Sequence, residues 1–135
     1  MYKRQYSYNY GLRNTDGSTL SYCSAPLQLP HGATITNATF YFYDNDAGYF
    51  EFYVMRGNLT EGWQAIGYVF NTPGSDTPGD AHVSLDTSVA TFYPQYATVD
   101  NDNYHYYLLM EMPYSSTSTS YYQFHYALVE YEYPA

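Results

Sequence analysis

TITNATFYFY, residues 34–43, is the stretch that decides the fold class. β-Branched and aromatic residues fill most of it, and these residue types favour extended strands. The apolar positions change phase between Ile35 and Phe40, which predicts a bulge in the strand. From Phe40 to Tyr43 the aromatic residues are consecutive, so both faces of the strand carry rings. Because a sandwich strand needs only one apolar face, we expect something else to cover the second face.

Short apolar runs of the same kind recur along the chain, with Gly, Pro, Asn and Asp between them. They make about ten predicted strands and no helix. A second change of phase, near Leu128 and Val129, predicts another bulge. This number and spacing indicate an all-β protein, a two-sheet antiparallel β-sandwich of the jelly-roll or Greek-key type. The predicted strands are Tyr2–Tyr10, Leu20–Ser24, Leu27–Leu29, Thr34–Tyr43, Tyr49–Arg56, Trp63–Phe70, His82–Asp86, Tyr96–Val99, Tyr104–Met112 and Tyr121–Tyr133.

Composition and charge exclude several classes of function. The 135 residues suit one domain. The net charge is −9, because 13 carboxylates face only Lys3, Arg4, Arg13 and Arg56. Phosphate backbones and anionic membrane surfaces need basic patches, and no apolar run reaches the length of a membrane span, so we expect neither a nucleic-acid partner nor a membrane span. The single cysteine, Cys23, cannot form an internal disulfide, and we expect it to be a small core residue.

The N-terminus carries a separate pattern. In YSYNYG, residues 6–11, tyrosine occupies every second position, so an extended chain would have one aromatic face. The tyrosines concerned are Tyr6, Tyr8 and Tyr10, with Tyr2 placed less regularly. The polar stretch LRNTDGST follows. We therefore divide the chain into an N-terminal extended strand (1–11), a polar spacer (12–19) and a jelly-roll domain (20–135).

Three segments together resemble a jelly-roll module of secreted and cell-surface bacterial proteins. They are LPHGATITNATFYFYDNDA (29–47), VDNDNYHYYLLMEMP (99–113) and FHYALVEYEYP (124–134). The module's pattern is Leu-Pro-x-Gly-Ala-x-Ile-Thr, then Tyr-Asp-Asn-Asp, then Val-Asp-Asn, with a closing Tyr-x-Tyr. The resemblance implies the fold and an extracellular or cell-surface location. It carries no activity, because the family is mostly of unassigned function.

The N-terminal strand departs from that module and is similar to the terminal strand of extracellular fibre subunits. In such fibres the strand completes the sheet of a neighbouring subunit, through main-chain hydrogen bonds and pockets for alternate side chains. The resemblance implies that Tyr2, Tyr6, Tyr8 and Tyr10 form a polymerisation strand that binds another copy of the chain. The alternative is that Tyr2–Tyr10 pairs within its own domain.

Two clusters of Asp and Asn suggest a cation. Asp44 and Asp46 stand in one, and Asp100 and Asp102 in the other, so each short loop offers several of the oxygen ligands that calcium prefers. The spacing matches no complete calcium loop, however, and Asn and Asp are also ordinary turn formers. Calcium is therefore a possible ligand, with turn formation as the alternative.

Nothing in the sequence predicts an enzyme. His31, His82, His105 and His125 are never at close metal-ligand spacing, and no serine or cysteine stands in the context of a nucleophile. A glycosidase needs two carboxyl groups about 5–10 Å apart. The glutamates on predicted strands alternate with apolar residues and read as solvent-facing; the five glutamates are Glu51, Glu61, Glu111, Glu130 and Glu132.

The sequence favours an association with sugars over catalysis, with the sugars either bound as a ligand or attached covalently. Trp63 and the tyrosines are suited to stack on a bound carbohydrate, although Trp63 would serve equally as a core anchor. Alternatively the sugars are attached. Asn37 and Asn58 begin acceptor sequons, and two polar segments resemble O-glycosylated loops. The segments are TPGSDTP (72–78) and SSTSTS (115–120), the latter with Ser115, Ser116 and Thr117 as first candidates.

These observations predict a non-enzymatic structural subunit of an extracellular filament or surface fibre. It would polymerise through its N-terminal strand into a homopolymer and would carry glycans. A head-to-tail contact of that kind does not close on itself, so it gives filaments. The alternative function is a carbohydrate-binding or adhesion module of a secreted protein.

Overall fold

A computed structural model describes residues 2–12, 21–45, 51–70, 79–112 and 121–133. No helix among these residues is long and apolar enough to cross a membrane. The described elements are β1 (Tyr2–Leu12), β2 (Ser21–Leu27), β3 (Thr34–Asn45), β4 (Glu51–Asn58), β5 (Gly62–Phe70), β6 (Gly79–Asp86), the 3-10 helix η1 (Pro94–Tyr96), β7 (His105–Met112) and β8 (Tyr121–Glu132).

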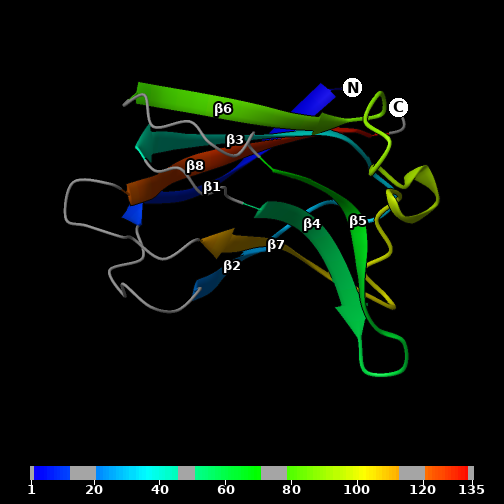
Figure 1. Ribbon diagram of the computed structural model, residues 1–135. Helices are drawn as coiled ribbons and strands as arrows, with labels where there is room; N and C mark the ends of the chain where they lie inside the picture. The colour runs from blue at the N-terminus through cyan, green and yellow to red at the C-terminus, as the bar shows by residue number, and fades with distance from the viewer. Residues whose placement is uncertain (1, 13–20, 46–50, 71–78, 113–120, 134–135) are drawn as a thin grey trace.

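The strands form two four-stranded sheets that lie face to face (Figure 1). Sheet A has the order β1-β8-β3-β6, and sheet B has the order β2-β7-β4-β5. Every pair of neighbouring strands is antiparallel. Pairs adjacent in a sheet are mostly far apart in the sequence, as in a jelly roll. The predicted all-β sandwich is therefore confirmed.

Aromatic rings join the two sheets in the core. Phe40 of β3 stacks on Phe52 of β4, with ring centroids 4.5 Å apart, and Phe42 lies 5.5 Å from the same ring. Phe124 of β8 completes the group at 6.2 Å from Phe52. All four rings are fully buried. Since alternate residues of a strand point to opposite faces, Tyr41 and its neighbours on β3 are left for the outer face.

The outer face of sheet A explains part of the double aromatic pattern of β3. Tyr41 stacks on Tyr126 of β8 at 4.4 Å and lies 5.7 Å from His82 of β6. These rings cover one another on the solvent side, and Tyr41 and Tyr126 are half-buried there. The second face of β3 is thus covered in part by its own neighbours in the sheet.

One predicted bulge is confirmed and the other is misplaced. The β3–β8 register skips Thr36, as the phase change between Ile35 and Phe40 predicted. In β8 the skipped residue is His125, so the prediction of a bulge near Leu128 and Val129 was wrong. Phe124 and Ala127 are both buried although they are three residues apart, which requires an extra residue between them.

Two predicted short strands were also wrong. Leu27 is the last residue of β2, and Leu29 lies in the following loop, so Leu27–Leu29 is not a separate strand. In the segment Tyr96–Val99, Tyr96 is the last residue of η1, and Thr98 forms an isolated bridge with Thr34 in place of a strand. Pro94 is the first residue of η1 and favours this short helix. Asp100 then starts a turn, in which its side chain accepts the backbone N–H of Asp102. The segment between η1 and this turn is therefore too short to form a strand.

The N-terminal strand lies at an edge of sheet A. β1 pairs antiparallel with β8 of the same chain, and the register sets Tyr2 opposite Glu132, Tyr6 opposite Leu128 and Tyr8 opposite Tyr126. The pairing is irregular between Tyr8 and Leu12, where Tyr10 lies. Pairing within the chain is one of the two arrangements considered for this strand. Donation of β1 to another copy remains a proposal.

Candidate functional site

The outer face of sheet B carries an unusual number of apolar side chains. In β7 the residues Tyr106, Leu108 and Met110 enter the core, so the alternate residues lie on the opposite, outer face. The strand registers place residues of β2, β4 and β5 beside them. This surface, called the aromatic face below, comprises Tyr22, Pro26, Glu51, Tyr53, Met55, Trp63, Ala65, Tyr68, Phe70, His105, Tyr107, Leu109 and Glu111.

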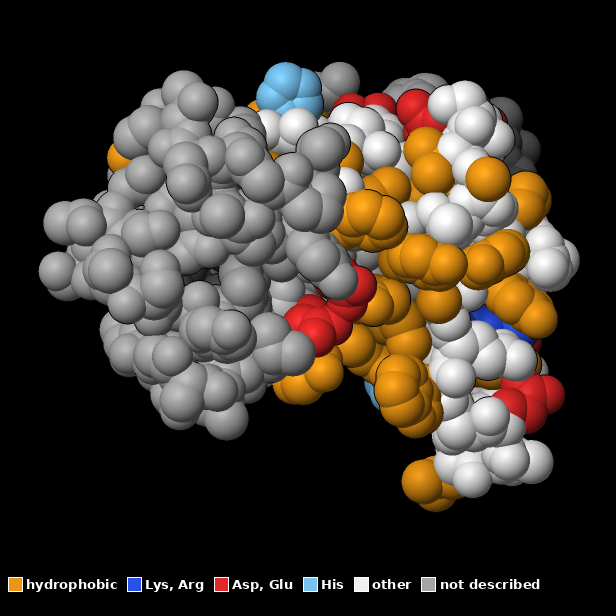
Figure 2. All heavy atoms as spheres, in the orientation of Figure 1, with side chains coloured by type: hydrophobic (Ala, Val, Ile, Leu, Met, Phe, Trp, Pro, Cys, Tyr) orange, Lys and Arg blue, Asp and Glu red, His pale blue; other side chains and the backbone are white. Residues whose placement is uncertain are grey.

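A hollow of about 330 Å³ lies in the aromatic face. Its base is apolar, since Met55 is only 2% exposed. Its rim is aromatic and open, because Trp63 is 69% exposed and Tyr22 is 63% exposed. Figure 2 shows hydrophobic side chains gathered over this part of the molecule, with acidic side chains beside them. The hollow is lined by Tyr22, Tyr53, Met55, Trp63, Ala65, Leu109 and Glu111.

One glutamate, Glu111, lines the hollow, and a second, Glu51, lies beside it on the adjacent strand. Glu51 of β4 and Glu111 of β7 are direct cross-strand partners, and their carboxyl groups are hydrogen-bonded to each other. That hydrogen bond, together with partial burial, raises the pKa of Glu111 from 4.5 to about 7. The Tyr53 hydroxyl donates to Oε2 of Glu51 at 2.9 Å, and the Tyr22 hydroxyl is hydrogen-bonded to Glu111.

The two carboxyl groups are therefore held in place by two tyrosine hydroxyls, of Tyr53 at Glu51 and of Tyr22 at Glu111. Burial and the hydrogen bond to Glu51 raise the pKa of Tyr53, and the charge of Glu111 raises the pKa of Tyr22, so both hydroxyls remain protonated donors. Within the described parts of the chain, no lysine or arginine lines the hollow. Arg56 is engaged elsewhere, with its guanidinium 4.4 Å from the Tyr96 ring centroid and 4.0 Å from that of Tyr104.

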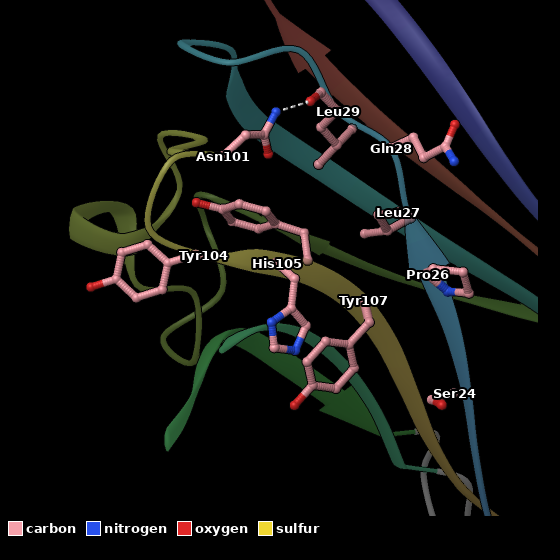
Figure 3. Close-up of a pocket in the computed structure, with 10 residues that line it drawn as sticks. Ser24, Pro26, Leu27, Gln28, Leu29, Asn101, Tyr104, His105 and Tyr107 are labelled. Carbon is pink, nitrogen blue, oxygen red and sulfur yellow. Dashed lines mark hydrogen bonds between the residues drawn. The ribbon is translucent and has the colours of Figure 1, made fainter. Parts of the chain in front are cut away.

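A second hollow, of about 660 Å³, continues the aromatic face towards the start of β7 (Figure 3). His105 and Tyr107 stack there with ring centroids 5.5 Å apart. On the other side, the Asn101 side chain donates to the carbonyl of Leu29 at 2.7 Å and fixes the loop against the end of β2. From His105 to Glu111 the strand is about 20 Å long, so the two hollows form one extended surface.

A possible cation group lies beside this second hollow. Ligand atoms of His31, Asp100 and Asp102 lie within 4.8 Å of one another. The backbone N–H of Asn101 donates to Nδ1 of His31 at 3.1 Å, and Asn103 donates to Oδ2 of Asp100 at 2.8 Å. The Asn103 hydrogen bond also lowers the pKa of Asp100. An imidazole with two carboxylates suits a transition metal better than calcium, which prefers oxygen ligands throughout.

The structure separates the two predicted acidic clusters. Asp44 is near the end of β3, and Asp46 lies outside the described residues. Asp100 follows the bridge between Thr98 and Thr34, which begins β3. Ten residues of strand separate these ends, or about 33 Å, so the clusters cannot share one ion. Calcium at Asp100 and Asp102 stays a prediction, which a chelator tests by lowering the melting temperature if an ion is lost.

The two predicted N-glycosylation sites differ in their surroundings. Asn37 lies within β3, and the next two residues of its sequon, Ala38 and Thr39, are only 1% and 7% exposed. Asn58 ends β4 beside the exposed Thr60, whose N–H it accepts at 3.1 Å while its Nδ2 donates to the Asn103 carbonyl. Ser115, Ser116 and Thr117 lie outside the described residues. Glycosylation stays a prediction, which an intact mass equal to that of the bare chain would reject.

Sequence reasoning found one residue of the aromatic face and missed its acidic pair. Trp63 was considered both as a sugar-stacking residue and as a core anchor; its exposure excludes the second role. Glu51 and Glu111 were expected to face solvent, and both are half-buried on the outer face of sheet B. In the sequence 59 residues separate them, and the β4–β7 register brings them together. The alternation of apolar residues predicts which face a glutamate occupies, and it carries no information on the partner strand.

Comparisons with known proteins give little beyond the fold. No family model matches the chain, and no curated protein matches it. Among solved structures, the coat protein of tobacco streak virus is similar, with a TM-score of 0.38 and 8% sequence identity over 98% of this chain and 86% of that chain. A likeness this weak supports no functional conclusion.

Proposed function

We propose that the protein is a carbohydrate-binding module and that the aromatic face of sheet B is its binding surface. One observation carries the proposal: a 330 Å³ hollow on an open sheet face has exposed Trp63 and Tyr22 at its rim and Glu111, the cross-strand partner of Glu51, in its lining. Ligand sites typically combine apolar walls with a few convergent polar groups. The hollow has this composition.

The chemistry of the face fits a sugar. The apolar face of a pyranose ring packs on an aromatic ring, and Trp63 and Tyr22 offer large, accessible rings for this contact. The sugar's hydroxyls need acceptors and donors, which the Glu51–Glu111 carboxyls and the Tyr53 hydroxyl supply. Because the surface extends for about 20 Å along β7, an oligosaccharide suits it better than a single sugar.

We favour a site that binds a sugar without cleaving it. A glycosidase holds its two carboxyl groups about 5–10 Å apart, so that a sugar carbon or a water molecule fits between them. The carboxyls of Glu51 and Glu111 are hydrogen-bonded directly to each other, which leaves no such space. The pair is better suited to hold a ligand group than to cleave a glycosidic bond.

A glycan array followed by titration calorimetry tests the proposal. The wild-type protein should bind at least one oligosaccharide, and Trp63→Ala should weaken that binding by tenfold or more, about 1.4 kcal/mol. Tyr133→Ala is the matched control, because Tyr133 is an exposed aromatic residue at the end of β8, away from sheet B. The melting temperature of each variant should stay close to that of the wild type. Absence of any glycan binding, or equal binding by Trp63→Ala, would overturn the proposal.

The second candidate function is the fibre subunit, and the edge position of β1 favours it. Among the described strands β1 pairs with β8 alone, and the same antiparallel register is available to the β1 of another copy. Such an exchange leaves sheet A complete in every subunit and joins the subunits in a line. Each aromatic ring buried at the junction would contribute about 1.5–3 kcal/mol. An extracellular location, implied by the bacterial jelly-roll module, suits either function.

Deletion of residues 1–10 separates strand exchange from simple pairing. If copies exchange β1, the truncated chain should remain folded but marginal, should form no fibres under the electron microscope, and should gain melting temperature when the peptide MYKRQYSYNYG is added. If the truncated chain unfolds outright and the peptide does not restore it, the strand belongs to its own sandwich. The fibre function would then be abandoned.

A further inference from the structure

The carboxyl pair in the aromatic face is unusual because none of the described side chains around it is basic. Glu51 and Glu111 are opposite each other on adjacent strands, where like charges destabilise a sheet. The groups facing the pair are Tyr53 from β4 and Tyr22 from β2, and the β5 residue opposite Glu51 is Phe70. No basic side chain is among them. The space between the two carboxyl groups is therefore suited to a cationic group of a ligand.

From this arrangement we infer that the aromatic face binds an amino sugar, whose primary ammonium group sits between Glu51 and Glu111. The inference rests on the proposed carbohydrate-binding function and names the ligand class. The ammonium would receive carboxylate acceptors and an aromatic neighbour, while the ring of the same sugar packs on Trp63 or Tyr22. Charge complementarity selects this occupant, because the described residues that line the hollow include an acidic and several aromatic side chains and no basic one.

The proposed exchange conserves charge and protons. At pH 6 the Glu111 carboxyl holds most of one proton, because its pKa is about 7. When the ammonium binds, that proton leaves to the solvent, and the two carboxylates and the one ammonium remain. No covalent bond forms or breaks in this step. Binding should therefore release about one proton at pH 6.

A pair of matched oligosaccharides tests the ligand class. The glucosamine tetramer carries an ammonium on each ring, and the N-acetylglucosamine tetramer has the same rings without the charge. At pH 6 the wild-type protein should bind the glucosamine tetramer at least tenfold more tightly. Calorimetry in two buffers of different ionisation enthalpy should show about one proton released for the glucosamine tetramer and none for the acetylated one.

Two variants show which residues are responsible. The double variant Glu51→Gln/Glu111→Gln should bind both tetramers equally and release no proton. Trp63→Ala should weaken the binding of both by a similar factor. Glu132→Gln, which removes an exposed carboxylate from sheet A, should retain the tenfold preference. Tetralysine, a cation without a sugar ring, should bind at least tenfold more weakly than the glucosamine tetramer.

The possible failures are distinguishable. If both tetramers bind equally to the wild type and Trp63→Ala weakens both, the amino-sugar inference is overturned and the carbohydrate-binding function stands. If tetralysine binds as tightly as the glucosamine tetramer and Trp63→Ala changes neither, the site recognises cations in general, and both proposals fail. Both also fail if no oligosaccharide binds at all.

Discussion

Glu111 makes the stability of the protein depend on pH near neutrality. Its pKa rises from 4.5 to about 7 in the folded chain, chiefly because of the hydrogen bond with Glu51. Between these values the folded state holds more protons than the unfolded state. The free energy of unfolding contributed by this group is therefore complete below about pH 4.5, decreases as the pH rises to 7, and is lost above it.

Thermal unfolding of Glu111→Gln at pH 5 and pH 8 checks this contribution. The wild type should lose more melting temperature between the two pH values than Glu111→Gln does. Glu132→Gln removes an exposed carboxylate and should keep the wild-type difference. Equal pH dependence in the wild type and in Glu111→Gln would show that folding does not raise the pKa of Glu111.

Arg56 stabilises one end of sheet B through contacts with two tyrosine rings and a glutamine. Its guanidinium lies between the rings of Tyr96 and Tyr104, and its Nε donates to Oε1 of Gln64 at 2.8 Å. The Tyr104 hydroxyl in turn donates to Glu61. Arg56→Ala removes two cation–π contacts and a hydrogen bond, and we expect it to cost about 1–3 kcal/mol.

The measurement for Arg56 is the free energy of unfolding from denaturant titration. Arg56→Lys keeps the charge but loses the planar group, and it should fall between Arg56→Ala and the wild type. A lysine variant as unstable as the alanine variant would show that the stacked guanidinium, rather than the positive charge, holds this end. An alanine variant as stable as the wild type would contradict the prediction.

Strands could be predicted from this sequence wherever alternation and β-branched or aromatic residues coincide, as in Thr34–Tyr43. Prediction failed where a short apolar run lies between a proline and a turn, because Tyr96–Val99 has the composition of a strand and no room for one. It also misplaced the bulge of β8, since Phe124 and Ala127 reveal the extra residue only when both are known to be buried. Local composition predicts an element and leaves its register open.

The same limit applies to the site. Trp63 stood out by residue type alone, whereas the carboxyl pair depends on the order of strands in sheet B. Two glutamates in a chain of 13 acidic residues give no sign of being neighbours. The cation group was half predicted: Asp100 and Asp102 were named from their cluster, and His31 joins them through the loop that precedes β3.

β5 depends on Gly67 for its close packing. The segment around Thr91 runs beside this strand and bonds to it: the Tyr93 N–H donates to the Ile66 carbonyl at 2.8 Å. A Cβ at Gly67 would lie 2.8 Å from a methyl carbon of Leu85 and 3.1 Å from the Thr91 carbonyl oxygen. We therefore expect Gly67→Ala to destabilise the protein by about 1–3 kcal/mol.

Gly57→Ala, a substitution in the neighbouring strand β4, is the comparison for Gly67→Ala. Its added methyl group would meet the His105 side chain at 3.1 Å and the Gly62 carbonyl at 3.3 Å, which are milder contacts. Denaturant unfolding should show a smaller loss for Gly57→Ala than for Gly67→Ala. The reverse order would mean that the segment beside β5 yields more easily than the structure indicates.

In the molecule as a whole, the two proposed functions use different sheets. The sugar site occupies the outer face of sheet B, and strand exchange would occur at the β1 edge of sheet A. The core between the sheets is a continuous layer of buried side chains that includes the stacked Phe40 and Phe52. A filament joined through sheet A would therefore leave the aromatic face of every subunit accessible, so the two functions are compatible.

The pairing of Tyr2 with Glu132 also brings the start and the end of the described chain together, as Figure 1 shows. A circular permutant can exploit this: a linker of about 2–5 residues after the end of β8 would turn β8 and β1 into a hairpin. New termini fit at Leu59, which is 106% exposed at the tip between β4 and β5. Such a chain should fold and bind sugar like the wild type by calorimetry. It should also form no fibres, because a strand joined to its partner by so short a loop cannot reach another molecule. If the permutant still assembles, the subunits are joined through some other surface.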